Sequence, residues 1–268
     1  ANKYIKNDSL SFMYGNLLYE NDNYNEAMSP LRSFIILHPY ESEVLIKLGD
    51  IFFKTQRYPE AIDTYLRLTE QFPHNEFYNL QIANCYYLLD NYADAKEFYI
   101  KVINLNEENH DVFLKLGQIA NKLYLFNEAV DYLNKALICG SPSKELLFEL
   151  GLAYGGQNKF LQALQVFKEA LKFSLDDPIL HYQLGVVYQA LSIYDLAINE
   201  YKIYLETNSS DIIVNYLVGE SYFKQNLYED AILFFNHNIN KTNYQDIKSL
   251  HYLGLCYLEL KNYKSAAK

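Results

Sequence analysis

The chain has 268 residues, of which 50% are hydrophobic and 16% aromatic, and its formal net charge is −10. This negative charge disfavours binding to nucleic acid or to an anionic membrane surface. The longest uncharged stretch, Pro178 to Tyr194, contains one His, one Ser and two Gln residues, so we expect no membrane span.

The chain repeats itself with a period of 34 residues. Residues 1–7 are polar and are expected to be frayed, and repeats then start near residues 8, 42, 76, 110, 144, 178, 212 and 247. One alanine recurs in step, at Ala27, Ala61, Ala95, Ala129, Ala163, Ala197 and Ala231. A fixed period of this length is typical of stacked repeats.

The last repeats depart from the strict period. The seventh has one extra residue near Lys241 to Tyr244, where a loop tolerates insertion. The eighth is cut off at Lys268, so its second helix is nearly missing. A solenoid needs a polar cap at its end. We therefore expect the natural protein to continue beyond Lys268, or this end to pack against another chain.

Other positions of the repeat show what each unit contains. Small residues recur at position 8, as Gly15, Gly49, Ala83, Gly117, Gly151, Gly185, Gly219 and Gly254. A glycine inside a helix costs about 1 kcal/mol, which close helix packing would explain. Aromatic residues recur nine positions later, and prolines such as Pro39 and Pro73 end a helix. The predicted unit is helix, tight turn, helix and loop.

This pattern resembles the tetratricopeptide repeat family. The repeat from Ser42 to Asn75 carries the family's motif residues as Leu45, Leu48, Gly49, Phe52, Ala61, Tyr65, Leu68 and Pro73. The resemblance covers about residues 8–268 and implies an all-α, right-handed superhelical solenoid of about eight helix-turn-helix repeats, the last one truncated. Asn79, Asn215 and Asn238 depart from the motif and are expected to weaken single repeats.

The resemblance also implies a concave groove lined by positions 2, 5, 9 and 12 of each first helix, which share one helical face. The predicted groove residues are Phe12, Asn16, Tyr19, Asp50, Phe53, Leu80, Asn84, Tyr87, Gln118, Asn121, Tyr182, Gln189, Tyr216 and Phe223. Amides such as Asn16 and Asn84 would hold a peptide backbone while the rings take its side chains. Alternatively, the position-5 residues are half-buried between repeats. Gly155-Gly156 is either a bare patch in the groove wall or a helix C-cap.

The sequence carries no catalytic motif. The six histidines stand singly, no phosphate loop or nucleophile elbow is present, and the three cysteines are far apart. We assign no catalytic residue, no metal and no cofactor. A clamp for a partner's terminal carboxylate is also not expected, since position 5 never holds a base.

These features predict a protein–protein interaction scaffold that binds a peptide or partner protein in the groove. Residues 1–134 carry 11 basic and 19 acidic residues, whereas residues 135–268 carry 12 and 14, which favours a basic partner toward the N-terminal half. Ordinary solubility would explain the same charge. The alternative function is a substrate-targeting or regulatory arm of a larger enzyme, for example a glycosyltransferase. A third is an assembly factor that self-associates through the truncated C-terminal repeat.

Overall fold

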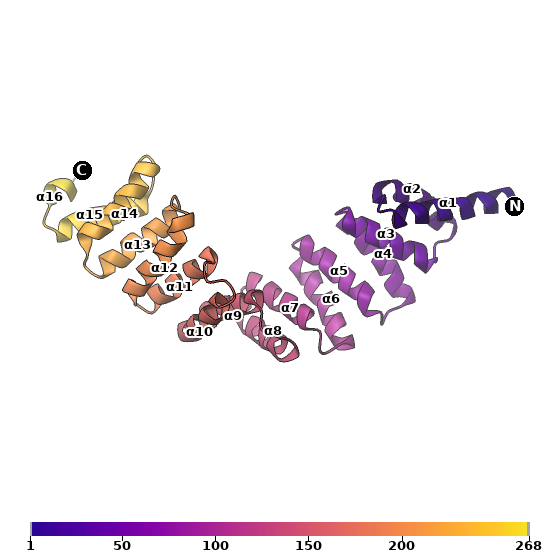
Figure 1. The fold of residues 1–268 in the computed structure, drawn as a ribbon, viewed down its shortest axis with the longest axis horizontal. Helices are drawn as coiled ribbons and strands as arrows, with labels where there is room; N and C mark the ends of the chain where they lie inside the picture. The colour runs from indigo at the N-terminus through magenta and orange to yellow at the C-terminus, as the bar shows by residue number, and fades with distance from the viewer. Residues whose placement is uncertain (1, 267–268) are drawn as a thin grey trace. The chain divides into compact units, whose positions relative to one another are not determined.

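The computed structural model describes residues 2–266, with side chains from Ser9 onward (Figure 1). This part of the chain forms sixteen helices and no strand, so the predicted all-α class is confirmed. The first helices of the hairpins are α1 (Asn2–Glu20), α3 (Ser42–Lys54), α5 (Glu76–Leu88), α7 (His110–Lys122), α9 (Lys144–Gly156), α11 (Pro178–Ala190), α13 (Ile212–Lys224) and α15 (Ile247–Glu259). The second helices are α2 (Tyr24–Leu37), α4 (Tyr58–Gln71), α6 (Tyr92–Leu105), α8 (Phe126–Cys139), α10 (Phe160–Leu171), α12 (Tyr194–Thr207), α14 (Tyr228–Lys241) and α16 (Tyr263–Ala266).

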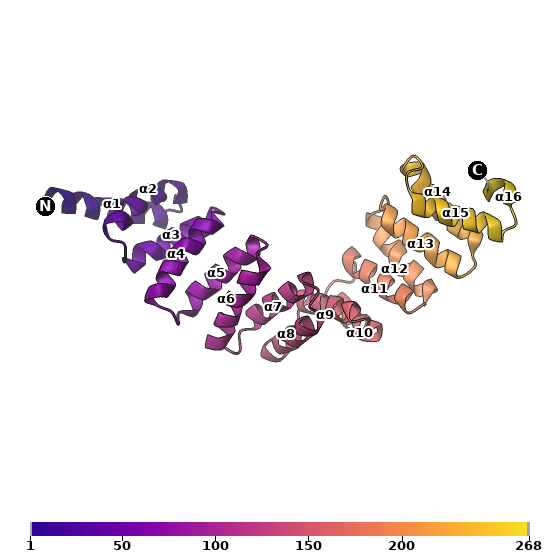
Figure 2. The same ribbon diagram turned by 180° about the vertical axis from the view of Figure 1, so that it is seen from behind.

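The helices form two compact units, which we describe separately. The N-terminal unit extends to Ile119 and the C-terminal unit begins at Ala120, so α7 spans the boundary. Within each unit, the second helix of one hairpin packs against the first helix of the next, as α4 does against α5 and α12 against α13. Both views of the ribbon show these successive hairpins side by side (Figures 1 and 2).

The turn within each hairpin uses the same backbone geometry every time. A non-glycine residue with φ between 55° and 60° occupies position 15, at Asp22, Gln56, Asp90, Tyr124, Asn158, Ser192, Asn226 and Lys261. The next amide then bonds back to the carbonyl five residues earlier, as Arg57 N does to Phe52 O at 2.7 Å. This is a Schellman-type helix end, which satisfies carbonyls that the helix leaves unpaired.

In four repeats, glycine at position 8 allows the first helix to approach an aromatic residue of the second helix closely. A Cβ added at Gly49 would stand 2.8 Å from the Tyr65 ring, and one added at Gly185 would stand 2.5 Å from the Tyr201 ring. Tyr65 and Tyr201 are themselves almost fully buried. The alanines at position 20 from Ala27 to Ala231 are fully buried too. The repeating small residues therefore lie where hairpins pack most closely.

The asparagines that depart from the family motif are buried and bonded. Asn79 donates through Nδ2 to the Asn75 carbonyl at 2.9 Å, and Asn215 donates to the Asp211 carbonyl at 2.8 Å. Each bond lies in the first turn of its helix, where it supplies a donor to a carbonyl oxygen. These two asparagines therefore keep a hydrogen-bonding role inside the repeat, because a buried amide is costly only when it is left unpaired.

Both ends of the chain lie partly outside the described residues. The segment 1–7, expected to be frayed, begins at Ala1, which is outside the description, whereas residues 2–7 are assigned to helix α1. At the other end, residues 267–268 lie outside the description, and the second helix of the eighth repeat is described only as the four residues of α16. Among the described helices, none has the length and hydrophobicity that crossing a membrane requires.

Candidate peptide-binding groove

All fourteen predicted groove residues lie on first helices. Nine belong to the N-terminal unit, from Phe12 to Gln118, and five to the C-terminal unit, from Asn121 to Phe223. Gln118 is buried and the other thirteen are half-buried. At position 5, Leu114 is buried whereas Leu80 keeps part of its surface exposed, so packing between repeats accounts for some of these apolar residues.

In the N-terminal unit, polar groove residues of α1 are bonded to α3. The Tyr19 hydroxyl donates to Asp50 Oδ2 at 2.7 Å, and Lys47 Nζ donates to Asn16 Oδ1 at 2.9 Å. Burial and the bond to Asp50 raise the pKa of Tyr19 to about 12. Lys54 pairs with Asp50 at 2.9 Å. These side chains, on the predicted groove face, therefore join neighbouring repeats.

The same unit has a second set of bonds further along. The Tyr99 hydroxyl donates to Asn84 Oδ1 at 2.7 Å, and the Tyr87 hydroxyl donates to Gln118 Oε1 at 3.1 Å. Lys115 Nζ lies 4.7 Å from the centre of the Tyr87 ring. The carbonyl of Asn84 is therefore already engaged within the protein, as is that of Asn16. Among the described side chains, neither Asn84 nor Asn16 uses its Nδ2 group as a donor.

In the C-terminal unit, Glu220, at position 9 of its repeat, is bonded to side chains of both neighbouring first helices, α11 and α15. It accepts from Gln189 Nε2 at 2.7 Å and from the Tyr252 hydroxyl at 3.0 Å. The Tyr252 ring lies 5.7 Å from that of Tyr216 and 5.2 Å from that of Phe223. Burial, followed by the charge of Glu220, raises the pKa of Tyr216. Tyr182, on α11, packs instead against Tyr204, with ring centres 5.6 Å apart.

Four repeats share one aromatic pair, in which the ring at position 12 packs edge-on against the ring at position 17. The ring centres lie 5.4–5.9 Å apart in the pairs Tyr19–Tyr24, Phe53–Tyr58, Tyr87–Tyr92 and Phe223–Tyr228. In the fifth repeat, position 12 is Gly155, and an added Cβ there would meet nothing within 4 Å. Phe160, at position 17 of that repeat, therefore has no position-12 ring opposite it.

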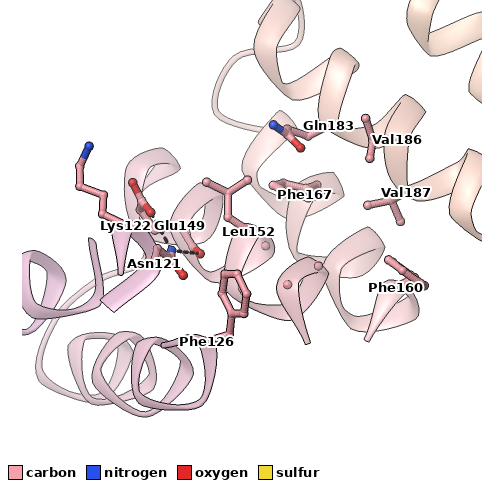
Figure 3. Close-up of a pocket in the computed structure, with 13 residues that line it drawn as sticks. Asn121, Lys122, Phe126, Glu149, Leu152, Phe160, Phe167, Gln183, Val186 and Val187 are labelled. Atoms are coloured by element: carbon pink, nitrogen blue, oxygen red, sulfur yellow. Dashed lines mark hydrogen bonds between the residues drawn. The ribbon is translucent and has the colours of Figure 1, made fainter. Parts of the chain in front are cut away.

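A cavity of about 470 Å³ lies at this point in the C-terminal unit (Figure 3). Its walls are mainly apolar and are formed by Phe126, Leu152, Phe160, Phe167, Val186 and Val187, with the backbone of Gly151, Gly155 and Gly156. Asn121, Lys122, Glu149 and Gln183 provide its polar groups. A pocket of this size, apolar with a few polar groups, is typical of a ligand site.

Asn121 is held in place at the edge of the cavity. Its Nδ2 donates to both the backbone carbonyl and the Oε2 of Glu149, each at 2.8 Å, as the dashed lines in Figure 3 show. Its Oδ1 is buried and has no hydrogen-bond partner among the described residues. Asn121 therefore joins α7 to α9, and its donor group is occupied within the protein.

Gly155 and Gly156 do not form a helix C-cap, so that alternative was wrong. Helix α9 includes both residues, and neither glycine has positive φ. Asn158 supplies the left-handed conformation instead, with φ 59°. The ring of Phe126 fills the space that a Gly156 side chain would need. The two glycines therefore act differently, since Gly156 allows close packing and Gly155 opens the cavity.

The sequence-based set missed most of the cavity wall. Phe126 and Phe160 belong to second helices, whereas the groove residues were chosen on first helices alone. The sequence signal that could have found them is Gly155, which is the one glycine at position 12, whereas position 17 is aromatic in every repeat.

Among the described residues, no three His, Cys, Asp or Glu side chains lie close enough together to ligate a metal ion.

Comparisons with known proteins agree with this architecture. Models of the tetratricopeptide repeat match residues 12–76 and 78–109, and a model of the TPR repeat matches residues 151–192. A search of curated protein sequences found no match.

Several solved structures share the fold. The C-terminal part of a TPR repeat-containing protein from Cytophaga hutchinsonii is 16% identical, with a TM-score of 0.71 over 90% of this chain and 99% of that one. A tetratricopeptide repeat protein from Parabacteroides merdae is 16% identical, with a TM-score of 0.62 over 94% and 99%. YrrB, described as a TPR protein with an unusual peptide-binding site, is 19% identical, with a TM-score of 0.62 over 70% and 96%.

The matched segments together cover about half of the chain and lie in both units. The repeating hairpins, the small residues at positions 8 and 20 and the aromatic residues that face them account for these matches in physical terms. The chain belongs to the tetratricopeptide repeat family.

Proposed function

We propose that this chain is a protein-interaction scaffold that holds a peptide, or an extended segment of a partner protein, along the inner face of its first helices. The observation that carries the proposal is the state of the groove residues. Thirteen of the fourteen are half-buried, so rings such as Phe53 and Phe223 are fixed by packing yet keep apolar surface open. Fixed aromatic surface of this kind is characteristic of binding sites.

Free amide donors support the proposal as well. Asn16 and Asn84 accept hydrogen bonds through Oδ1, which leaves each Nδ2 available to donate to a peptide carbonyl. Because the Oδ1 bonds fix each side chain, little rotamer freedom would be lost when a peptide binds. YrrB has a peptide-binding site on the same fold, which adds support by analogy.

The predicted basic partner stays a prediction. Three lysines of the N-terminal unit contact predicted groove residues: Lys47 contacts Asn16, Lys54 contacts Asp50 and Lys115 contacts Tyr87. Lys47 also pairs with Glu43. Local charge there is more balanced than the net charge of −10 indicates. We therefore propose that rings and amides, rather than long-range charge, select the partner in this unit.

We also propose that the chain acts by binding and carries out no catalysis itself. Asp50 and Glu220, the two carboxylates at position 9 of the predicted groove, are bonded to tyrosine and amide groups of neighbouring repeats. Such bonds point to a structural role for both carboxylates. No observation in the described residues favours the larger-enzyme alternative over the scaffold.

A peptide library displayed on phage would test the proposal. The wild-type chain should enrich a common sequence, and the triple variant Tyr19→Ala, Phe53→Ala, Tyr87→Ala should lose that enrichment. Since Tyr19 and Tyr87 also bond between repeats, the matched control is Tyr19→Phe with Tyr87→Phe, which keeps both rings. Circular dichroism would verify that each variant is helical. No enrichment by the wild-type chain would contradict the proposal.

A further inference from the structure

We propose that the cavity at Gly155 receives a phenylalanine side chain of the bound peptide. This inference rests on the proposed function, because it names the side chain that the C-terminal unit would select. The cavity lies wholly within that unit, between α9 and its neighbouring hairpins (Figure 3).

The protein itself indicates the shape of the occupant. In four other repeats a ring at position 12 packs edge-on against the ring at position 17, with centres 5.4–5.9 Å apart. At Gly155 the position-17 ring, Phe160, is present and the position-12 ring is absent. A ring supplied by the partner would restore the arrangement that the chain uses elsewhere, and edge-on pairs of this kind are favourable.

The neighbouring side chain favours phenylalanine over tyrosine. Where position 12 is tyrosine, its hydroxyl donates to a polar residue at position 9 of the next repeat, as Tyr19 does to Asp50 and Tyr87 to Gln118. Next to Gly155 that position is Val186, which cannot accept a hydrogen bond. A buried hydroxyl without a partner is unfavourable. Where other repeats accept this hydroxyl, the cavity offers only an apolar side chain, which favours a ring that carries no polar group.

The polar groups of the cavity give no preference for a charged peptide. Lys122 and Glu149 carry opposite charges on the same wall, and Asn121 already donates to Glu149. A phenylalanine flanked by uncharged residues fits this edge. The C-terminal half has only two more acidic than basic residues, 14 against 12, which agrees with an uncharged flank.

Filling the cavity from within provides the first test. Gly155→Phe would place a ring at position 12, so we expect the variant to melt at a higher temperature than wild type. Loss of the glycine alone should stabilise the helix, so Gly155→Ala is the matched control and should melt below Gly155→Phe. Leu161→Phe, which places a ring at an exposed site of α10, should leave the melting temperature nearly unchanged. A melting temperature for Gly155→Phe at or below that of Gly155→Ala would show that the cavity does not fit a ring and would overturn the inference.

Peptide binding provides the second test. Peptides selected from a phage-displayed library by the wild-type chain should share a phenylalanine, and replacing it with alanine should weaken binding about tenfold or more. Gly155→Phe should weaken the same peptides, and Leu161→Phe should not. The chain contains no tryptophan, so a Phe→Trp peptide would report burial by a blue shift of its own fluorescence.

The outcomes separate the two proposals. If the wild-type chain selects no peptide, the proposed scaffold function fails, and the proposal that a phenylalanine fills the cavity fails with it. If peptides are selected but share no phenylalanine, or bind Gly155→Phe as tightly as wild type, the scaffold stands and this inference alone is overturned.

Discussion

Two glycines in the C-terminal unit should respond to alanine in opposite directions. Gly185 is at position 8 of its repeat and Gly155 is at position 12. Both lie inside first helices, where alanine is favoured over glycine by about 1 kcal/mol. The intrinsic helical preference is therefore the same for the two substitutions, and only their surroundings differ.

The surroundings set the sign of the change in stability. A Cβ at Gly185 would lie 2.5 Å from two carbons of the buried Tyr201 ring, so the ring or a helix must shift. Overpacking of this kind costs about 1–3 kcal/mol. A Cβ at Gly155 would meet nothing within 4 Å. Because the contact at Gly185 is severe, we expect Gly185→Ala to lower the free energy of unfolding by about 1–2 kcal/mol and Gly155→Ala to raise it by about 1 kcal/mol.

Urea denaturation, followed by circular dichroism, measures this difference. Since repeats interact with their nearest neighbours, the curves should be fitted with a nearest-neighbour model of the array rather than a single transition. A Gly185→Ala chain as stable as wild type, or a Gly155→Ala chain less stable than wild type, would refute the packing explanation of the small residues.

Three further predictions concern single side chains. Ser192→Gly should raise the free energy of unfolding by about 1 kcal/mol, because Ser192 has φ 60° and only glycine adopts that conformation without strain. Ser192→Ala should give no such gain, and thermal melts of both variants would test the difference. The hydrogen bond of Tyr19 should be worth about 1 kcal/mol at neutral pH. Since the pKa of Tyr19 is raised to about 12, the extra stability of wild type over Tyr19→Phe should be lost as the pH rises from about 10 through 12. Urea titrations of both chains across that range would measure the difference, and a difference that does not change with pH would contradict this hydrogen bond. Burial raises the pKa of Cys85 to about 12 and that of Cys256 to about 11, whereas Cys139 is half-buried. A thiol reagent at pH 8 should therefore label Cys139 first and the other two cysteines only when the chain unfolds. Mass spectrometry of the labelled chain would show this order.

The fold was predictable because its signal is repeated many times. Glycines at position 8 from Gly15 to Gly219 face a large side chain wherever their surroundings are described, and the alanines at position 20 from Ala27 to Ala231 are fully buried, so the period separates both kinds of small residue from chance. The bonds between repeats were less accessible. Asn16 and Asn84 were predicted to hold a peptide backbone, yet their carbonyl oxygens accept from Lys47 and Tyr99. A sequence does not reveal which partner a flexible amide selects when several lie within reach.

The cavity was beyond sequence analysis for a different reason. A pair of adjacent glycines near a helix end is compatible with either a C-cap or a bare helix surface, and only backbone φ decides between them. Here Asn158 adopts the left-handed conformation, which leaves Gly155 helical and its side of the helix uncovered. The cavity also depends on Phe126 and Phe160, which come from two different second helices.

The most direct test of the account is to map where a selected peptide binds. Methyl-labelled samples of the chain, titrated with the peptide, would show which side chains change their NMR signals. We predict changes at Leu80 in the N-terminal unit, or at Leu152 and Val186 in the C-terminal unit, with little change at exposed second-helix residues such as Leu161 and Leu233. Changes confined to Leu161 and Leu233 would contradict binding along the first helices.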